Sequence, residues 1–456
     1  MELRDAVTQQ QEELLKSLQE SVRIRSVEEH DDSGFPYGEG VQRSLEHALA
    51  TARRCGFETS DMDHQVGWCE YGSGEEMIAV LGHLDVVPEG DGWSVDPFGG
   101  EIRDGKIWGR GTMDDKGPVF AALYAMKALK ESGLPLRRRI RLMFGTNEET
   151  GSADMKYYLG HGGELPLMGF TPDGEYPVIN GEKGIVNVAF RKQYTQSGPV
   201  RLMRLSGGSA PNVVPAAASA ELRCPREMAE ELRRTAPEKV ACTLTKEGVR
   251  IEAAGVGAHG STPEQGENAI GRLMQTLRKL PLEGGLKEAV EFLAVKVGME
   301  TDGASLGIAL YDEVSGGLTL NLGTIEGGEE ELNLRINYRY PVTKRLEDCD
   351  PVLRRAFEEA GFQLTGQSHK KSLYVPEDSE LIQALLKVYT RETGLEARPK
   401  SIGGGTYAKA IPNIVAFGPI FPGDEVREHK PDEFIEVEKL MKNAQIIAQA
   451  LYELAK

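Results

Sequence analysis

The sequence predicts an α/β fold in which a discontinuous first domain, with a mixed sheet flanked by helices, carries an inserted α+β domain. Three observations support this prediction. The chain has 456 residues, which is too many for one ordinary hydrophobic core. Short apolar runs bounded by Gly and Pro alternate with helix-prone stretches in the first part of the chain. From about residue 182 to 375 this pattern gives way to period-two alternation with Gly-rich turns.

Three apolar runs predict buried strands of the first domain, and each leads into a loop with acidic residues or histidine. The runs cover residues 77–81, 140–144 and 168–170, and a helix is expected at 119–131. In sheets of this kind, ligands bind beyond the carboxyl ends of the strands. The loops that follow the runs are therefore the expected place for a functional site.

The inserted domain is expected at residues 182–375, which leaves 1–181 and 376–456 for the first domain. Its clearest strand alternates apolar and polar residues, the pattern of a half-buried strand. The apolar positions are Leu332, Leu334, Ile336 and Tyr338. After the insertion, the patterns predict a helix at 380–389, a core strand at 413–417 and a terminal helix at 434–454.

The composition restricts the classes of partner. The chain has 71 acidic and 53 basic residues and a formal net charge of −18, which repels nucleic acid and anionic membrane surfaces. The N-terminal stretch lacks the basic and apolar segments of a secretion signal, and no apolar run has membrane-spanning length. Five scattered cysteines form no C-x-x-C pair, which argues against a disulfide framework. We therefore expect a cytoplasmic protein that binds neither nucleic acid nor membranes.

His83 and Asp85 follow the first apolar run and are the first candidates for a metal site. On an extended segment the two side chains point to the same side, so Asp85 could hold the second imidazole nitrogen of a ligating His83. The alternative is a strand-end hydrogen bond with no metal.

Two pairs of adjacent carboxylates are the next candidates. Asp114 and Asp115 lie in a Gly-rich loop before the helix that Pro118 is expected to open, and capping of that helix is the alternative role. Glu148 and Glu149 directly follow the second apolar run. Adjacent glutamates often form a solvated surface, but this is less expected immediately after a core strand.

Asp173 and His429 complete the set, although each alone fits a surface turn or loop. The argument for a site is that all these candidates fall at strand ends or loops of the first domain. Histidines and carboxylates together suit Zn²⁺, Mn²⁺ or Co²⁺. Two such ions that share one carboxylate would carry out metal-assisted hydrolysis.

Several motifs resemble those of the aminoacylase/carboxypeptidase superfamily of two-metal peptidases. They are GHLDVVP at 82–88, GRGTMDDKG at 109–117, NEETG at 147–151 and AHG at 258–260. Three further motifs are similar to the dipeptidase V (carnosinase-like) branch, namely GDGWSVDPF at 90–98, TPDGEYP at 171–177 and GGGTYA at 403–408. The resemblance covers nearly the whole chain in order. One departure is the charged segment 423–428 before His429, which leaves loop geometry and specificity open.

The resemblance implies a binuclear centre with defined ligands. His83 and Asp173 would bind one metal, Glu149 and His429 the other, and Asp114 would bridge both. Asp114 is chosen over Asp115 because the family pattern is Asp-x-Lys. Glu148 would be the general base, taking a proton from the metal-bound water, which becomes the hydroxide shared by the metals, and returning that proton to the leaving amine.

The resemblance also assigns residues outside this centre. His259 would stabilise the oxyanion, Asn212 would contact it, and Arg339 would bind the substrate's carboxylate. Gly404 and Gly405 belong to a motif expected to contact substrate. The alternative for His259 is a loop histidine before a helix capped by Ser261 or Thr262. The alternative for Arg339 is a surface arginine on a strand edge.

The implied function is hydrolysis of short unblocked dipeptides by a metal-dependent enzyme. An inserted domain of roughly 190 residues could act as a lid over both ends of a short substrate within one chain, which favours a monomer. The alternatives are an aminoacylase or carboxypeptidase of the same superfamily, or a metal- or peptide-binding protein without catalysis.

Overall fold

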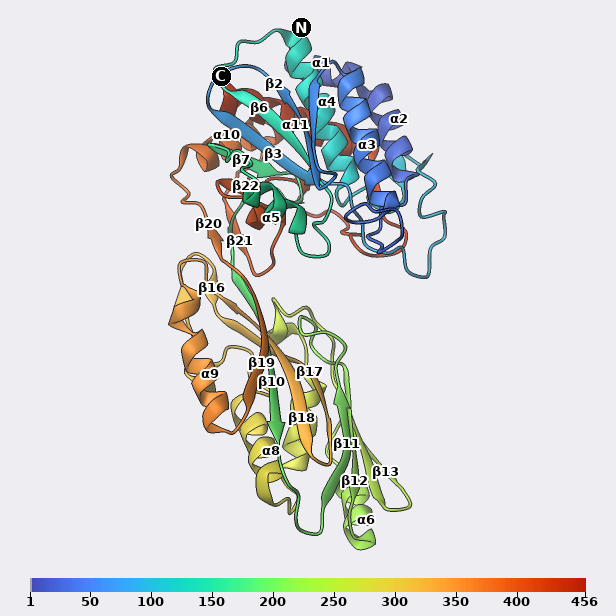
Figure 1. Cartoon of the computed structure of the whole chain (residues 1–456), viewed down its shortest axis with the longest axis vertical. Helices are drawn as coiled ribbons and strands as arrows, with labels where there is room; N and C mark the ends of the chain where they lie inside the picture. The colour runs from blue at the N-terminus through green and yellow to red at the C-terminus, as the bar shows by residue number, and fades with distance from the viewer. Residues whose placement is uncertain (1) are drawn as a thin grey trace. The chain divides into compact units, whose positions relative to one another are not determined.

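The computed structural model describes residues 2–456, which divide into two compact units. The first unit contains the described residues up to Asn180 together with Val375–Lys400 and Thr406–Lys456, and the second contains Gly181–Tyr374 and Ser401–Gly405 (Figure 1). The segment Ser401–Gly405 was expected in the first domain. It lies with the second unit because Lys183 N donates to Ile402 O at 3.0 Å and Arg339 Nη1 donates to Gly403 O at 2.7 Å.

The first unit is built on a mixed sheet. Six of the nine strands of this sheet are, in spatial order, β1 (Glu58–Met62), β2 (Val66–Tyr71), β6 (Arg139–Gly145), β3 (Met77–His83), β7 (Met168–Thr171) and β22 (Ile414–Ala416). The short strands β9 (Ile179–Glu182), β20 (Leu373–Tyr374) and β21 (Lys400–Ile402) continue it beyond β22. Strands β6, β3, β7 and β22 run parallel, whereas β1 and β2 pair antiparallel. All seven residues of β3 are buried, as expected for a parallel strand covered on both faces. The α/β fold class is therefore confirmed.

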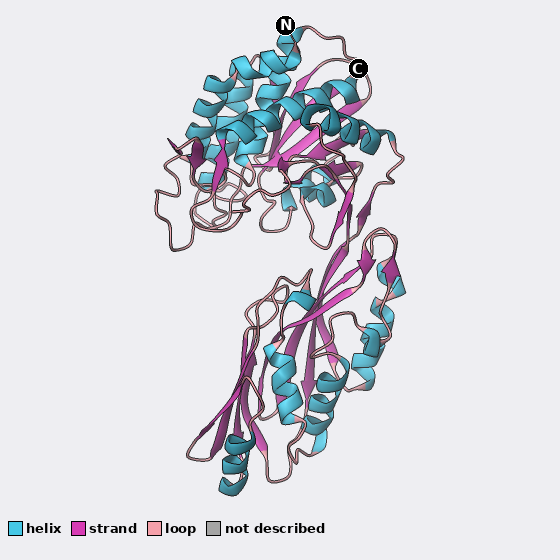
Figure 2. Ribbon diagram, turned by 180° about the vertical axis from the view of Figure 1, so that it is seen from behind, coloured by secondary structure: helices cyan, strands magenta, loops and turns pink. Residues whose placement is uncertain are grey.

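Helices cover this sheet (Figure 2). Helices α4 and α11 pack against β3 and β6, and α3 packs against β1 and β2. The helix bounds are α1 (Leu3–Gln9), α2 (Gln11–Val22), α3 (Glu39–Arg54), α4 (Lys116–Ser132), α5 (Ala153–Gly160), α10 (Glu380–Thr393) and α11 (Val437–Ala455). Helix α4 begins at Lys116 rather than at Pro118, so the Asp114-Asp115 pair lies directly before it. Within residues 2–456, no helix has both the length and the apolar character needed to cross a membrane.

The C-terminal segment differs from its predicted form. The expected helix at 434–454 starts later, because Phe434–Glu436 forms strand β24 and pairs antiparallel with β5 (Lys106–Trp108). Phe434 lies opposite Trp108, and their rings are 4.9 Å apart. The pairing depends on a contact between segments more than 300 residues apart, which the helical pattern of the C-terminus cannot reveal.

The second unit is an eight-stranded antiparallel sheet. Its strands, in spatial order, are β13 (Val240–Leu244), β14 (Gly248–Ala254), β12 (Ala217–Arg223), β11 (Arg201–Gly207), β17 (Thr319–Gly328), β18 (Glu331–Tyr340), β10 (Gly184–Gln193) and β19 (Gln363–Lys370). Helices α6 (Arg226–Thr235), α7 (Ala269–Leu277) and α9 (Asp350–Glu359) pack against this sheet, and α8 (Gly284–Lys296) packs against α7. The apolar positions predicted on β18 are buried in the core of this unit.

The remaining elements are short. The strands are β4 (Glu101–Arg103), β8 (Gly174–Glu175), β15 (Tyr311–Asp312), β16 (Gly316–Gly317) and β23 (Pro419–Ile420). The 3₁₀ helices are η1 (Pro263–Gln265), η2 (Ala304–Leu306), η3 (Leu346–Asp348) and η4 (Tyr407–Ala410).

Candidate metal centre

The parallel strands β3, β6 and β7 bring polar residues to one edge of the first unit's sheet. His83 is the last residue of β3, and Asp173 lies two residues beyond the end of β7. Glu148 and Glu149 follow β6, whose last residue, Gly145, lies opposite His83 in the β3–β6 register. Because parallel strands end at the same edge, residues from three separate segments of the chain converge there.

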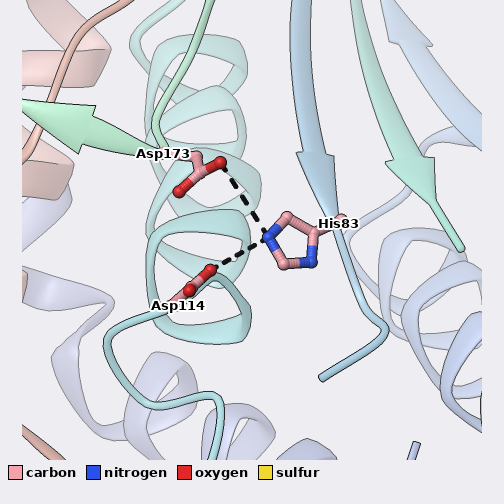
Figure 3. A group of neighbouring side chains, drawn as sticks. All are labelled: His83, Asp114 and Asp173. Carbon is pink, nitrogen blue, oxygen red and sulfur yellow. Dashed lines mark hydrogen bonds and ion pairs between the residues drawn. The ribbon is translucent and has the colours of Figure 1, made fainter. Parts of the chain in front are cut away.

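Asp114 lies at the centre of this group and uses both of its carboxylate oxygens. Its Oδ1 is 3.0 Å from His83 Nε2, and its Oδ2 is 3.0 Å from His429 Nε2. Asp173 Oδ2 lies 4.0 Å from the same nitrogen of His83. Figure 3 shows the Asp114 and Asp173 carboxylates directed at that nitrogen. One carboxylate thus joins two groups of donor atoms.

The second group consists of Asp114, Glu149 and His429. Glu149 Oε1 lies 3.2 Å from His429 Nε2. His429 comes from the loop between β23 and β24 and has a φ of +58°, a left-handed conformation that residues other than Gly adopt infrequently. The imidazole is half-exposed, unlike the buried His83.

Asp85 and Asp115 form hydrogen bonds with the candidate ligands and with the residues next to them. His83 Nδ1 lies 3.0 Å from the main-chain oxygen of Asp85 and 3.4 Å from its Oδ1, so the backbone carbonyl makes the shorter contact. The Asp85 carboxylate accepts from the N–H groups of Glu148 and Glu149, both at 3.1 Å. Asp115 accepts from His83 N at 3.1 Å, so Asp114 alone of the doublet lies between the two imidazoles.

The charges in this group favour divalent cations. Burial and the neighbouring Asp114 raise the pKa of Asp173 to about 7. Burial, together with Asp173 and Glu149 and against the effect of His83, raises the pKa of Glu148 well above its usual value. Asp114 differs, because its bonds to His429 and His83 outweigh burial and lower its pKa. Nitrogen and carboxylate donors this close to one another suit Zn²⁺, Mn²⁺ or Co²⁺, which would relieve the repulsion between carboxylates.

Sequence reasoning missed a pair that supports the glutamate loop. The Tyr407 hydroxyl donates to Asp154, and the Asp154 carboxylate accepts from Thr146 N at 2.7 Å and Asn147 N at 3.2 Å, immediately before Glu148. The Tyr407 ring also packs edge-on against His83, with ring centroids 5.9 Å apart. The GGGTYA motif contains Tyr407, but its spacing gives no sign of Asp154 as a partner.

The candidates in the second unit also lie near one another. Gly260 N donates to Asn212 O at 2.7 Å, which joins the loops of His259 and Asn212. His259 Nδ1 lies 2.6 Å from Ser261 Oγ, so Ser261 contacts His259 and caps no helix. Ser261 in turn lies against Gly403, which begins the glycine segment containing Gly404 and Gly405. The imidazole is exposed in this unit.

Arg339 is a buried cation and not the surface arginine considered as an alternative. It is 3 % exposed, and its guanidinium donates to Gly403 O and to Asn337 Oδ1. Burial lowers its pKa to about 10. Among residues 2–456, no carboxylate forms an ion pair with Arg339. A buried guanidinium without a counter-ion favours the binding of an anionic group.

Comparison with known proteins places this chain in a family. The family model described as peptidase family M20/M25/M40 matches residues 79–453. The chain belongs to this family. It is 39% identical over 466 residues to the Bacillus subtilis (strain 168) protein YtjP, whose name assigns it provisionally to the dipeptidases, with 99% of each chain covered. It is 33% identical over 455 residues to the Beta-Ala-Xaa dipeptidase of Lactobacillus delbrueckii subsp. lactis, covering 97% of this chain and 96% of that protein.

A solved structure supports the fold of this M20 family member. Human carnosine dipeptidase 1 superposes with a TM-score of 0.56 at 16% identity, covering 99% of this chain and 98% of the other. At that identity the likeness concerns the fold alone. Membership of a peptidase family agrees with the expectation of a hydrolase that acts on peptide bonds.

Proposed function

We propose that this protein is a metal-dependent dipeptidase that hydrolyses short, unblocked peptides. The observation that carries the proposal is the Asp114 carboxylate, whose two oxygens each lie 3.0 Å from a different histidine and so join two groups of donors. Peptidase family membership and the names of the relatives at 39% and 33% identity support the substrate class.

The first unit would hold two divalent cations. His83 and Asp173 would bind one, Glu149 and His429 the other, and Asp114 both, with Zn²⁺ or Mn²⁺ favoured and Co²⁺ a third candidate. Two bound cations supply Lewis acidity and make water a stronger acid.

Glu148 is the proposed general base. It lies beside Glu149, and the burial that raises its pKa well above the usual value makes it a stronger proton acceptor. Its carboxylate would accept a proton from the attacking water and deliver it to the leaving amine nitrogen. Asp85 would keep Glu148 in place, because its carboxylate accepts from the backbone N–H of that residue.

Residues of the second unit are the proposed substrate contacts. Arg339 would bind the peptide's C-terminal carboxylate, with its guanidinium oriented by Gly403 O and Asn337. Partial burial and the charge of Arg339 lower the pKa of His259, which disfavours the imidazolium form, and a neutral imidazole still has one N–H to donate to the oxyanion. Asn212, Gly404 and Gly405 would contact the same substrate.

We further propose a cytoplasmic monomer. All five cysteines are free in the structure, which is compatible with a reducing compartment. A single chain contains both the proposed metal ligands and the proposed carboxylate-binding residue. Light scattering of the purified protein at working concentration tests the oligomeric state.

A substrate panel tests the proposed function. The enzyme loaded with Mn²⁺ is given a dipeptide, the N-acetylated amino acid and a longer peptide with the same residues. We expect the highest kcat/KM for the dipeptide. Preference for the N-acetylated amino acid would indicate an aminoacylase, preference for the longer peptide a carboxypeptidase, and binding without turnover a non-catalytic protein.

A further inference from the structure

Arg110 and Glu433 form a buried ion pair, and neither residue is a proposed metal ligand, general base or substrate contact. Arg110 Nη1 lies 2.6 Å from Glu433 Oε2, and the two side chains are 2% and 0% exposed. The partners are 323 residues apart in sequence. Removing two charges from water costs free energy that their attraction can fail to recover, so stabilising the fold is not a sufficient reason for such a pair. Its remaining hydrogen bonds show what else it does.

Glu433 binds the backbone that presents Asp114. Its Oε1 accepts from Gly111 N at 3.0 Å, from Met113 N at 2.9 Å and from Asp114 N at 3.3 Å. Three N–H groups of one loop therefore converge on a single carboxylate oxygen. This loop has no regular structure between β5 and α4, so these bonds replace those that a helix or strand would supply.

Arg110 binds two further loops. Its Nη1 donates to Lys430 O at 3.3 Å, and its Nη2 donates to Glu89 O at 3.2 Å. Lys430 directly follows His429 in a turn where His429 has a φ of +58° and Asp432 a φ of +56°. The left-handed conformation of non-Gly residues persists only where surrounding contacts impose it.

We infer that the Arg110–Glu433 pair positions Asp114 and His429, two candidate ligands whose loops are bonded directly to this pair. His83 differs, because it is the last residue of the buried parallel strand β3 and is paired with Gly145 of β6. Asp173 follows strand β7 by two residues. The pair thus acts mainly on the donor group of Asp114, Glu149 and His429. The inference rests on the proposed binuclear centre.

Metal binding by conservative variants tests this role. Arg110→Lys keeps the charge beside Glu433 but loses the planar fork that reaches both loops, and Glu433→Gln keeps the shape of the acceptor. Arg141→Lys is the matched control, since Arg141 is also buried and bonded to two carboxylates, Glu70 and Glu164, neither of them a candidate ligand. His429→Ala gives the reference for a missing second ion.

Each protein is stripped with chelator and dialysed against a series of Mn²⁺ concentrations, and bound metal and Tm are measured. We expect the second Mn²⁺ to bind roughly 10- to 100-fold more weakly in Arg110→Lys and Glu433→Gln, while the first changes little. Arg141→Lys should lower Tm and keep both ions. Millimolar Mn²⁺ should restore two ions to the Arg110 and Glu433 variants but not to His429→Ala.

Two results would overturn the inference. One is unchanged affinity for both ions in Arg110→Lys and Glu433→Gln. The other is an equal loss of metal in Arg141→Lys, which would show that any weakening of the unit has the same effect. If the wild-type chain itself fails to bind two Mn²⁺ ions, the proposed centre fails, and this outcome is visible before any variant is compared.

Discussion

Replacing Arg339 with methionine should abolish the recognition of a substrate carboxylate while leaving the metal centre intact. A guanidinium has five N–H donors, and two of the Arg339 donors are used for Gly403 O and Asn337 Oδ1. Three remain, which is enough for a bidentate bond to a carboxylate. At about 1.5–3 kcal/mol for each of these two hydrogen bonds to a charged group, the loss is roughly 3–6 kcal/mol. This corresponds to a decrease of about two to four and a half orders of magnitude in kcat/KM.

The assay compares a dipeptide with its C-terminal amide, which lacks the negative charge. For the wild type we expect the amide to be the poorer substrate, and for Arg339→Met the two substrates should become similar because the discriminating cation is absent. Arg335→Met is the matched control, since Arg335 lies on the same strand and the same face as Arg339 but is exposed. Metal content and Tm are measured for each variant.

A wild type that hydrolyses the amide and the dipeptide equally well would remove Arg339 from the site. A decrease in Arg339→Met that is the same for both substrates would also refute the reasoning, because it would indicate general disruption rather than loss of one ionic contact. Arg335→Met should remain within about threefold of the wild type, since isolated surface charges contribute little.

Three further predictions concern the other groups. Glu148→Gln should keep both metals and lose nearly all turnover, since a base is not needed to hold cations; loss of an ion on metal analysis would contradict this. His259→Ala should lower kcat about 100-fold with metal content unchanged, the effect of removing one oxyanion donor, and an unchanged kcat would exclude that role. Finally, Asp173 has its pKa raised from 3.8 to about 7, so the folded metal-free protein retains a proton there that the unfolded chain loses above pH 4. The contribution of Asp173 to the stability of the metal-free protein should therefore fall as pH rises from about 4 to 7. Mn²⁺ affinity should rise up to tenfold per pH unit below 7 and level off above it, whereas a constant affinity from pH 6 to 8 would contradict the assigned shift.

The convergence of the candidate ligands could be predicted from the sequence because it follows from a general property of parallel sheets. His83 and Asp173 each end or follow an apolar run, and the ends of parallel strands meet at one edge. Glu149 follows strand β6, which lies between β2 and β3 in the sheet. The same argument fails for His429, whose loop has no strand pattern before it, and there the resemblance to the family supplied the assignment.

The groups that support the ligands could not be predicted, because they depend on contacts between distant segments. The charged sequence around Glu433 predicts a surface position, yet the side chain is fully buried against Arg110 and the loop of Asp114. Asp154 likewise binds a tyrosine 253 residues away. Local patterns describe which side of an element faces the core, but they do not identify the partner of a buried polar side chain.

Strand β18 shows both the strength and the limit of the period-two pattern. The alternation places Leu334 and Ile336 in the core correctly. It also assigns Arg339 to a polar face, and the structure buries that residue because the segment Ser401–Gly405 covers the end of the strand. This covering segment comes from the far end of the chain, so the pattern on β18 alone cannot reveal it.

The central claim is that Asp114 joins two cations in one hydrolytic centre, and a metal titration with a paired rate measurement tests it most directly. The chelator-stripped protein is titrated with Mn²⁺, and bound metal and dipeptide hydrolysis are measured in the same samples, with Asp114→Asn alongside. We predict two ions per chain, turnover that rises as both bind, and an Asp114→Asn protein that has lost at least one ion and nearly all activity. Full turnover in the stripped protein, or an Asp114→Asn protein with two ions and the wild-type rate, would contradict the account.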